Sequence, residues 1–416
     1  MRVAEKLVPE LRFSGLSDEW HRKRFSDVLI LKSRPFKMDD ESEYSLVTVK
    51  RRYGGVISRG IYRGKEILVK SQFKLEENDF IISKRQIVHN ACGIVPRNLS
   101  GSIVSNEYSV FKPKSNLDIV YFNYFCHLPK ISHTFYLSSI GVHIEKMLFK
   151  VDDWLKWRFY FPTLAEQQKI ASFLSAVDKK IEKLTRKKEL LEKYKKGVMQ
   201  RIFSREIRFK DENGKDFPVW VEKKIKEFVI DEKSGMKIGP FGSQLKKDTL
   251  VKEGYKVYGQ ENVFLQKFNF GDRFISKVHF DRLKTNEIKS GDFIISTMGT
   301  IGKSCIVPEN IQKGIMDSHI IRLRLDKTIM IPDFLKQIFL IFDVQKQIQR
   351  YSVGGIMDGL SMGIINELKF NIPTSIDEQQ KIANFLSTID KKIQAVQTQL
   401  TQTQEFKKGL LQKMFV

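Results

Sequence analysis

Two related stretches decide the architecture of this chain: PTLAEQQKIASFLSAVDKKIEKL at Pro162–Leu184 and PTSIDEQQKIANFLSTIDKKIQAV at Pro373–Val396. The match resumes further on as YKKGVMQRIF at Tyr194–Phe203 and FKKGLLQKMF at Phe406–Phe415. The two copies are offset by a constant 212 residues through most of their length, and about half of the positions are identical. A match of this length indicates an internal repeat, so one structural plan is expected twice.

The repeat also reaches into the regions between these stretches. NDFIIS at Asn78–Ser83 matches GDFIIS at Gly291–Ser296, and IVP recurs at Ile94–Pro96 and Ile306–Pro308. The order is therefore globular head, long helix, globular head, long helix. The predicted boundaries are 1–160 for the first head, 161–204 for the first helix, 205–372 for the second head and 373–416 for the second helix.

Both repeat stretches are expected to be coiled-coil helices. Apolar residues recur with a period of about 3.5 residues, and a proline precedes each run, where helices begin. The predicted seam residues are Leu174, Val177, Ile181, Leu184 and Leu191 in the first helix, and Leu386, Ile389, Ile393, Val396 and Leu400 in the second. Phe173 and Phe385 are expected to be core residues.

The two helices are expected to pair with each other in antiparallel fashion. Each would be roughly 60 Å long at 1.5 Å per residue, with a head at either end and a pseudo-two-fold relation between the halves. The alternative is that each amphipathic helix packs on its own head alone. Typical globular helices of about 10–14 residues are much shorter than these, which favours the coiled coil.

The heads are predicted to be mixed α/β or α+β domains built around a mixed sheet. Strands are expected at Tyr44–Lys50, Asp79–Ser83, Asp292–Thr297 and His319–Leu325, and a helix at Asp333–Arg350.

Composition narrows the class of protein. The 416 residues carry a net charge of +23, and 41% of them are hydrophobic, which excludes a disordered chain and favours a polyanionic partner such as nucleic acid. The positive excess is spread over both heads and both helices. The three cysteines have no metal or disulfide spacing. The start, MRVAEKLVPELRF, carries charges where a signal peptide needs an apolar run, and no apolar stretch is long enough to span a membrane. A cytoplasmic protein is expected.

The repeated EQQKIAxFLSxxDKKI helices, closed by KKGxxQxxF, resemble the helical regions of specificity subunits of type I restriction–modification enzymes. The head openings RFSGLSDEWHRKRFSDV and IRFKDENGKDFPVWVEKKIKEF, the loop GPFGSQLK at 239–246 and the stretch GDFIISTMGTIGKSCIVP at 291–308 are also similar to that family. The resemblance covers essentially the whole chain, although the first head lacks the GPFGS loop.

This resemblance implies a non-catalytic subunit with two target recognition domains, each reading one half of a bipartite double-stranded DNA site in a bacterial or archaeal phage-defence system. The coiled coil would set the spacer and dock two methyltransferase subunits, and a motor–nuclease restriction subunit would join them. S-adenosylmethionine, ATP and magnesium would be bound by the partner subunits, so no cofactor is expected in this chain.

The residues themselves carry no catalytic motif. GTIGKS at 299–304 lacks the first glycine of a phosphate-binding loop, because Thr297 stands in its place. No methyltransferase signature and no metal-ligand spacing is present. The alternative function is a stand-alone DNA-binding or architectural protein such as a regulator, whereas a self-sufficient nuclease or methyltransferase is disfavoured.

Base reading favours Arg or Lys for guanine and Asn or Gln for adenine, presented on loops. Tyr53 and Tyr258 are more expected to pack than to stack on bases, and His319 is a further option. The candidate DNA contacts are Lys50, Arg51, Arg52, Lys84, Arg85, Gln86 and Asn90 in the first head, and Ser243, Gln244, Lys246, Lys247, Gln260, Asn262 and Lys303 in the second.

The Glu-Gln-Gln triplets that begin at Glu166 and Glu378 are not explained by the seam. One interpretation is helix chemistry, because acidic groups favour the first turn. The other is contact with methyltransferase subunits.

Overall fold

The computed structural model describes residues 8–231, 235–298, 302–352 and 360–416. The chain forms two compact units: one runs up to Arg186 and includes Gln397–Val416, and the other comprises Lys187–Val396. Each unit thus holds one head together with part of both long helices. Within the described ranges no helix is long and apolar enough to cross a lipid bilayer.

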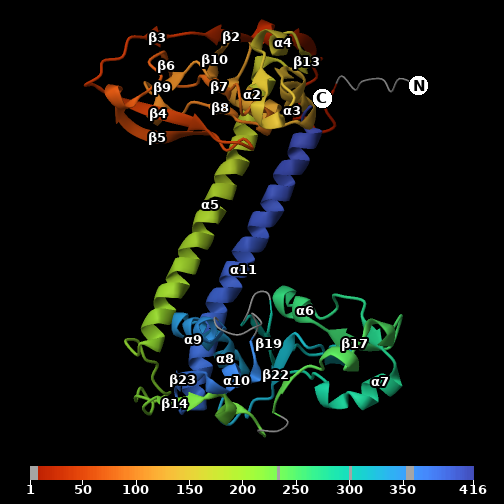
Figure 1. Cartoon of the computed structure of the whole chain (residues 1–416). Helices are drawn as coiled ribbons and strands as arrows, with labels where there is room; N and C mark the ends of the chain where they lie inside the picture. The colour runs from red at the N-terminus through yellow and green to blue at the C-terminus, as the bar shows by residue number, and fades with distance from the viewer. Residues whose placement is uncertain (1–7, 232–234, 299–301, 353–359) are drawn as a thin grey trace. The chain divides into compact units, whose positions relative to one another are not determined.

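The first unit contains a four-stranded sheet in the order β2-β10-β7-β8 and a five-stranded sheet in the order β3-β6-β9-β4-β5, with two small ribbons, β1-β13 and β11-β12 (Figure 1). Its strands are β1 (His21–Arg24), β2 (Leu29–Lys32), β3 (Pro35–Phe36), β4 (Glu43–Val49), β5 (Val56–Arg63), β6 (Gln72–Lys74), β7 (Phe80–Ser83), β8 (Cys92–Ile94), β9 (Ile103–Ser105), β10 (Tyr108–Pro113), β11 (Ser139–Ile140), β12 (Leu148–Phe149) and β13 (Arg158–Phe161). Its short helices are α1 (Phe25–Val28), α2 (Ile119–Cys126), α3 (Pro129–Leu137) and α4 (Val151–Leu155).

The second unit repeats this plan, with the sheet β15-β22-β19-β20, the sheet β16-β18-β17-β21 and the ribbon β14-β23. Its strands are β14 (Val221–Lys224), β15 (Met236–Ile238), β16 (Leu250–Val251), β17 (Tyr255–Tyr258), β18 (Phe274–Ile275), β19 (Phe293–Ser296), β20 (Ser304–Ile306), β21 (Gly314–Met316), β22 (Ile320–Leu323) and β23 (Lys369–Ile372). Its short helices are α6 (Gln260–Leu265), α7 (Lys277–Arg282), α8 (Pro332–Ile338), α9 (Phe342–Ser352) and α10 (Met362–Glu367).

The repeated FIIS strands explain why the two heads share a fold. In β7, Phe80 and Ile82 enter one apolar core while Ile81 enters another. In β19, Phe293 and Ile295 likewise enter one core, and Ile294 enters another. Because side chains alternate across a strand, one fully apolar strand joins two cores. Each second sheet also contains one parallel pair, β4 with β9 and β17 with β21, so the predicted mixed sheets are confirmed.

The long helices are α5 (Leu164–Phe203) and α11 (Ile376–Lys413). In the first unit, Leu174 near the start of α5 shares a core with Leu410 near the end of α11. In the second unit, Leu386 near the start of α11 shares a core with Ile202 near the end of α5. The pairing is therefore antiparallel in each unit, as predicted, and the alternative of two helices that pack only on their own heads is wrong.

Ion pairs at matched positions accompany the seam in both units. Lys407 lies 2.6 Å from Asp178 in the first, and Lys195 lies 2.7 Å from Asp390 in the second. Both lysines and both aspartates are related by the repeat offset. The predicted seam residues are buried or half-buried: Leu174, Val177, Leu386, Ile389, Val396 and Leu400 are buried, and Ile181, Leu184, Leu191 and Ile393 are half-buried.

The single helix predicted at Asp333–Arg350 is wrong, because α8 ends before α9 begins. A tight turn made by Leu340 and Ile341 separates them. Apolar residues of both short helices, among them Leu335 of α8 and Val344 of α9, lie in one core.

Candidate nucleic-acid interface

A buried ion pair joins each head to the helix that follows it. Arg12 donates to both carboxylate oxygens of Glu166, with Nη2–Oε2 at 2.7 Å, and the Glu166 side chain is 1% exposed. At the matching place in the second unit, Arg208 donates to Glu378, with Nη2–Oε2 at 2.9 Å. Hydrogen bonding to Glu166 raises the pKa of the Arg12 guanidinium. Two-point guanidinium–carboxylate pairs are directional, so each head has a defined orientation on its own helix.

The neighbouring glutamines complete the same junction. The Gln167 side chain accepts from the backbone N–H of Asp118 at 2.9 Å and donates to a backbone carbonyl that precedes the helix. Gln379 accepts from the backbone N–H of Ile331 at 3.0 Å and also donates to the carbonyl before its helix. Each glutamine therefore ties the start of a long helix to its own head.

The glutamate of each triplet lies in the first turn of its long helix, as the helix-chemistry interpretation expects. The glutamate and first glutamine of each triplet are also buried against their own unit, so these side chains do not face a partner subunit. Gln168 and Gln380 are exposed, and they alone of the triplet side chains face outward.

In the first head, the two candidate segments lie together. The backbone N–H of Arg52 donates to His89 at 2.7 Å, and that of Tyr53 donates to Asn90 at 2.9 Å. Arg52 and Tyr53 are consecutive non-glycine residues with φ of +56°. Such residues cost of order 1–3 kcal/mol each and cluster at functional sites. The surrounding contacts hold this turn at the surface in a strained form.

The individual side chains of this patch differ in how free they are. Lys50 and Arg52 are exposed and have no carboxylate partner among the described residues. Arg51 donates to Gln86 and Glu145, both at 2.7 Å. The others bond to nearby protein groups: Lys84 to the Asn106 carbonyl, Arg85 to Glu107, and Asn90, which accepts from Ser132.

Tyr53 packs, as expected. Its ring lies 4.1 Å from that of His127, and its hydroxyl donates to the Cys126 carbonyl at 2.7 Å. Burial raises the pKa of Tyr53. Tyr258 is fully buried, donates to Gln312 at 2.5 Å, and has its pKa raised to about 12 by burial.

In the second head, Asn262 was a candidate DNA contact, and this assignment is wrong. Its side chain is buried, accepts from the backbone N–H of Gly259 at 2.9 Å and donates to the carbonyls of Lys267 and Phe270. Both N–H groups of the Asn262 amide are therefore used within the protein, and the buried side chain cannot reach a DNA base.

The other candidates of the second head lie at its surface. Gln244, Lys246, Lys247 and Lys303 are exposed, and His319 is partly exposed. Gln260 is half-buried, and its Oε1 has no hydrogen-bond partner among the described residues. The side chain of Ser243 lies outside the described residues, as do positions 299–301 of the GTIGKS stretch.

The sequence patterns missed two residues in this region, Arg273 and Asp317, whose side chains meet at 2.8 Å. They are distant in sequence and belong to no motif. The only signal was the pair of glycines, Gly239 and Gly259, where a side chain would collide with Asp317 or Arg273.

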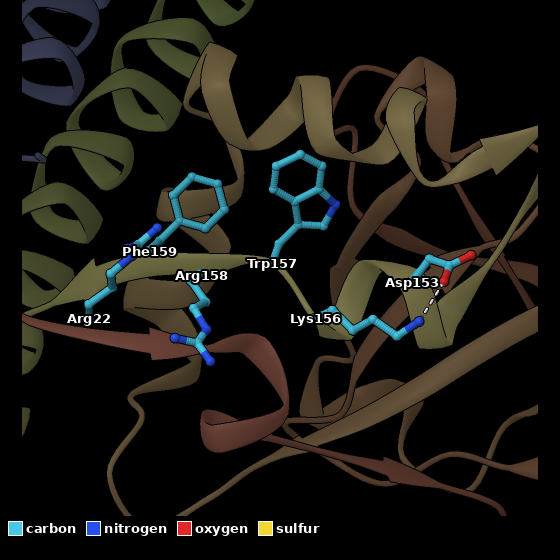
Figure 2. Close-up of a pocket in the computed structure, with 6 residues that line it drawn as sticks. All are labelled: Arg22, Asp153, Lys156, Trp157, Arg158 and Phe159. Carbon is cyan, nitrogen blue, oxygen red and sulfur yellow. Dashed lines mark hydrogen bonds and ion pairs between the residues drawn. The ribbon is translucent and has the colours of Figure 1, made fainter. Parts of the chain in front are cut away.

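A further basic surface lies on the ribbon β1-β13, just before α5. Arg24 stands opposite Arg158 in the ribbon register, and like charges in that position are destabilising. Neither has a carboxylate partner among the described residues. In Figure 2, Arg158 points to the opposite side of the strand from Trp157 and Phe159, and Lys156 pairs with Asp153 at 2.9 Å.

The equivalent ribbon of the second unit is neutralised. Lys224 stands opposite Lys369, but Lys224 pairs with Glu367 at 2.8 Å and Lys369 pairs with Glu222 at 2.9 Å. The unpaired arginines of the first ribbon are therefore a feature of one unit only, and they suit an anion.

Nothing in the described part of the chain gathers three or more metal-ligating side chains into one group. The three cysteines are buried, and burial raises the pKa of Cys305 to about 12. The surface features are basic and amide-rich loops on two similar heads, which suit binding to a polyanion.

Comparison with known proteins agrees with this arrangement. The family model described as "Type I restriction modification DNA specificity domain" matches twice, at residues 17–193 and 220–404. The type I restriction enzyme MjaVIII specificity subunit of Methanocaldococcus jannaschii is 23% identical over 98% of this chain and 94% of its own length. The putative MjaX specificity subunit of the same organism is 24% identical over 60% of this chain and 56% of its own.

Two solved structures share the fold. The S subunit of the type I restriction–modification system from M. genitalium has a TM-score of 0.61 and 16% identity, covering 98% of this chain and 99% of that one. A chain from a structure of type I restriction–modification complex assembly has a TM-score of 0.54 and 16% identity, covering 96% and 97%.

Proposed function

We propose, given that this chain belongs to the type I restriction–modification DNA specificity family, that each of its two units reads one half of a bipartite DNA site. The observation that carries this proposal is the duplication: two matched domains, each with a four-stranded sheet of equivalent strand order and each clamped to its own long helix. One recognition surface per unit gives one half-site per unit. Catalysis belongs to other subunits of the complex.

We further propose that α5 and α11 set the spacer between the half-sites. The Arg12–Glu166 and Arg208–Glu378 clamps hold each head against its helix start, and α5 is one unbroken helix of 40 residues. Because each head has a fixed orientation on its helix, the length of the helices would determine the distance between the two half-sites on the DNA.

The same helices would dock two methyltransferase subunits. Tyr194 and Phe406 occupy matched positions of the repeat and are 53% and 54% exposed. Single exposed apolar side chains are common on protein surfaces, so the support for docking is that an exposed aromatic residue recurs at the matched position of each unit. A restriction subunit would complete the assembly, with S-adenosylmethionine, ATP and magnesium bound by these partners.

The test is methylation profiling in cells that carry the whole system, comparing the natural chain with one lengthened between the units. Four residues are inserted after Arg186 in α5 and four after Val396 in α11, where the units divide. Four helical residues add about 6 Å, so the spacer should grow by roughly one to two base pairs while both half-sequences stay unchanged. Changed half-sequences would contradict the division of labour.

Methylation without any split motif that depends on this chain would exclude the proposal as a whole. A stand-alone DNA-binding protein would instead bind a specific duplex at full strength without partners, which a titration at several salt concentrations reveals.

A further inference from the structure

Arg273, Asp317 and His319 form one polar cluster in the second unit. Arg273 Nη2 donates to Asp317 Oδ2 at 2.8 Å. The imidazole Nδ1 of His319 lies 3.5 Å from the other carboxylate oxygen, which also accepts from the backbone N–H of His319 at 3.0 Å. The Asp317 side chain is 7% exposed, whereas those of Arg273 and His319 are 39% and 42% exposed. A buried carboxylate thus holds two exposed, nitrogen-bearing side chains.

The backbone brings several loops to this cluster. The Asp317 N–H donates to the Tyr258 carbonyl at 2.9 Å, and the Thr297 N–H donates to that of His319 at 3.0 Å. Gly239, at the start of the GPFGS loop, donates to Ile320 at 3.1 Å. The ends of β15, β17, β19 and β21 therefore meet here, so the cluster lies among the loops that carry most of the candidate contacts of this head.

Two glycines make the cluster possible. A Cβ on Gly239 would lie 1.9 Å from the Asp317 carbonyl oxygen, and one on Gly259 would lie 2.3 Å from Arg273 Nη2 and 2.9 Å from Asp317 Oδ2. Contacts below 3.0 Å exclude any side chain unless the neighbours move. The first glycine of GPFGS therefore serves the approach to Asp317, which accounts for a motif residue that the candidate contacts left unexplained.

We propose that Arg273, positioned by Asp317, reads a guanine in the half-site recognised by the second unit. This inference rests on the proposed function of that unit. Arginine recognises guanine by two parallel hydrogen bonds to O6 and N7 in the major groove. A carboxylate that holds one edge of the guanidinium fixes the direction of the other edge, as a specific contact requires. His319, on the same carboxylate, is a positioning residue.

The purely structural arginines of this unit look different. Arg322 is 1% exposed and donates to the Glu287 carbonyl at 2.7 Å. Arg324 donates to Asp292 from Nε and to Glu287 from Nη2, and so uses two of its nitrogens inside the protein. Arg273 uses Nη2 for Asp317, and its other nitrogens have no partner among the described residues. Arg273 therefore differs from Arg322, because it is 39% exposed and has guanidinium nitrogens that can reach a ligand.

The experiment compares the natural chain with Arg273→Lys in cells carrying the whole restriction–modification system, read out by sequencing of methylated adenines. The substitution keeps the charge but removes the forked donor geometry. One guanine position in one half-site should lose its discrimination, by about 5- to 150-fold. The other half-site and the spacer should be unchanged. Asp317→Asn should weaken discrimination at the same position.

Arg282→Lys is the matched control, because Arg282 is an exposed arginine at the end of α7 in the same unit and outside the cluster. It should leave the motif unchanged. A second readout uses the purified complex and a duplex carrying 7-deazaguanine, which lacks the N7 acceptor, at the sensitive position. The natural complex should lose affinity for it, whereas the Arg273→Lys complex, which lacks the forked donor pair, should show a smaller difference between the two duplexes.

An Arg273→Lys motif identical to the natural one would overturn the inference while leaving the proposed function intact. A change spread over both half-sites would overturn it as well. A natural chain that directs no split motif would instead show that the proposed function itself is wrong.

Discussion

His127, the residue that follows α2, has a strongly lowered pKa. Its ring packs on Tyr53, and its Nε2 is buried without a hydrogen-bond partner. Burial, together with nearby Lys407 of α11, lowers its pKa to about 4 against the opposing effect of Asp178 of α5. Because Lys407 and Asp178 form the ion pair of the seam, this histidine connects head and coiled coil in the first unit.

The first unit should therefore lose stability as the pH falls from about 6.5 to 4. In that window the unfolded chain binds a proton that the folded chain does not bind, so the free energy of unfolding rises with pH. The difference between an ordinary histidine pKa of 6.5 and about 4 corresponds to roughly 3–3.5 kcal/mol. Urea unfolding at several pH values, followed by the fluorescence of Trp20, Trp154 and Trp157, measures it.

His127→Asn should flatten this pH dependence, and His143→Asn, which alters an exposed histidine of the same unit, should not. A slope that persists in the first variant would assign the proton uptake to another group.

Asn262 and Arg273 show where sequence reasoning stops at the scale of residues. An asparagine in a polar loop has the chemistry of an adenine reader, but here its amide satisfies the first turn of α6. Arg273 gains its fixed direction from Asp317, 44 positions away. Neither outcome follows from local sequence, because both depend on which backbone groups tertiary packing brings near.

At the scale of elements, periodicity was the dependable signal. The 3.5-residue pattern predicted both long helices, and the buried FIIS runs predicted β7 and β19. The continuous helix predicted across Phe339 is wrong, because the segment forms two short helices, α8 and α9, and apolar residues on both sides of the break, among them Phe334 and Val344, lie in one core. Apolar runs therefore predicted which segments are buried, but they did not predict where a buried segment breaks into two helices.

The ribbon β1-β13 carries the element-scale prediction. If Arg24 and Arg158 contact DNA phosphates, replacing both with Gln should lower the salt dependence of binding by the complex by about two units of slope. It should weaken binding to all sequences alike. Because the substitution removes a like-charge pair, the stability of the unit should stay constant or rise. Titrations at several salt concentrations measure the slope.

The matched control replaces both Lys224 and Lys369 with Gln on the ribbon β14-β23, where Glu367 and Glu222 already neutralise the two lysines. It should leave the salt dependence unchanged. Equal effects of the two substitutions would show that net charge, and not the unpaired ribbon, determines binding.

For the molecule as a whole, the main structural property is that the two units repeat the same set of contacts. The clamps, the seam ion pairs and the exposed aromatic residues each occur twice at matched positions, once in each unit. The loops that carry the candidate contacts differ between the units: the strained turn at Arg52 and Tyr53 belongs to the first, and the Arg273–Asp317–His319 cluster belongs to the second. The chain therefore combines a repeated frame with two different reading surfaces, which suits identical partners and non-identical half-sites.

This contrast leads to a prediction about stoichiometry. If Tyr194 and Phe406 each dock one methyltransferase subunit, Tyr194→Ala should remove one of the two subunits from the complex, and the double variant should remove both. Lys193→Ala, beside Tyr194 on the exposed surface of α5, is the control and should keep both. Native mass spectrometry of co-expressed complexes counts the subunits directly. If Tyr194→Ala released both subunits at once, docking would depend on one shared surface, and the repeat would not act as two independent sites.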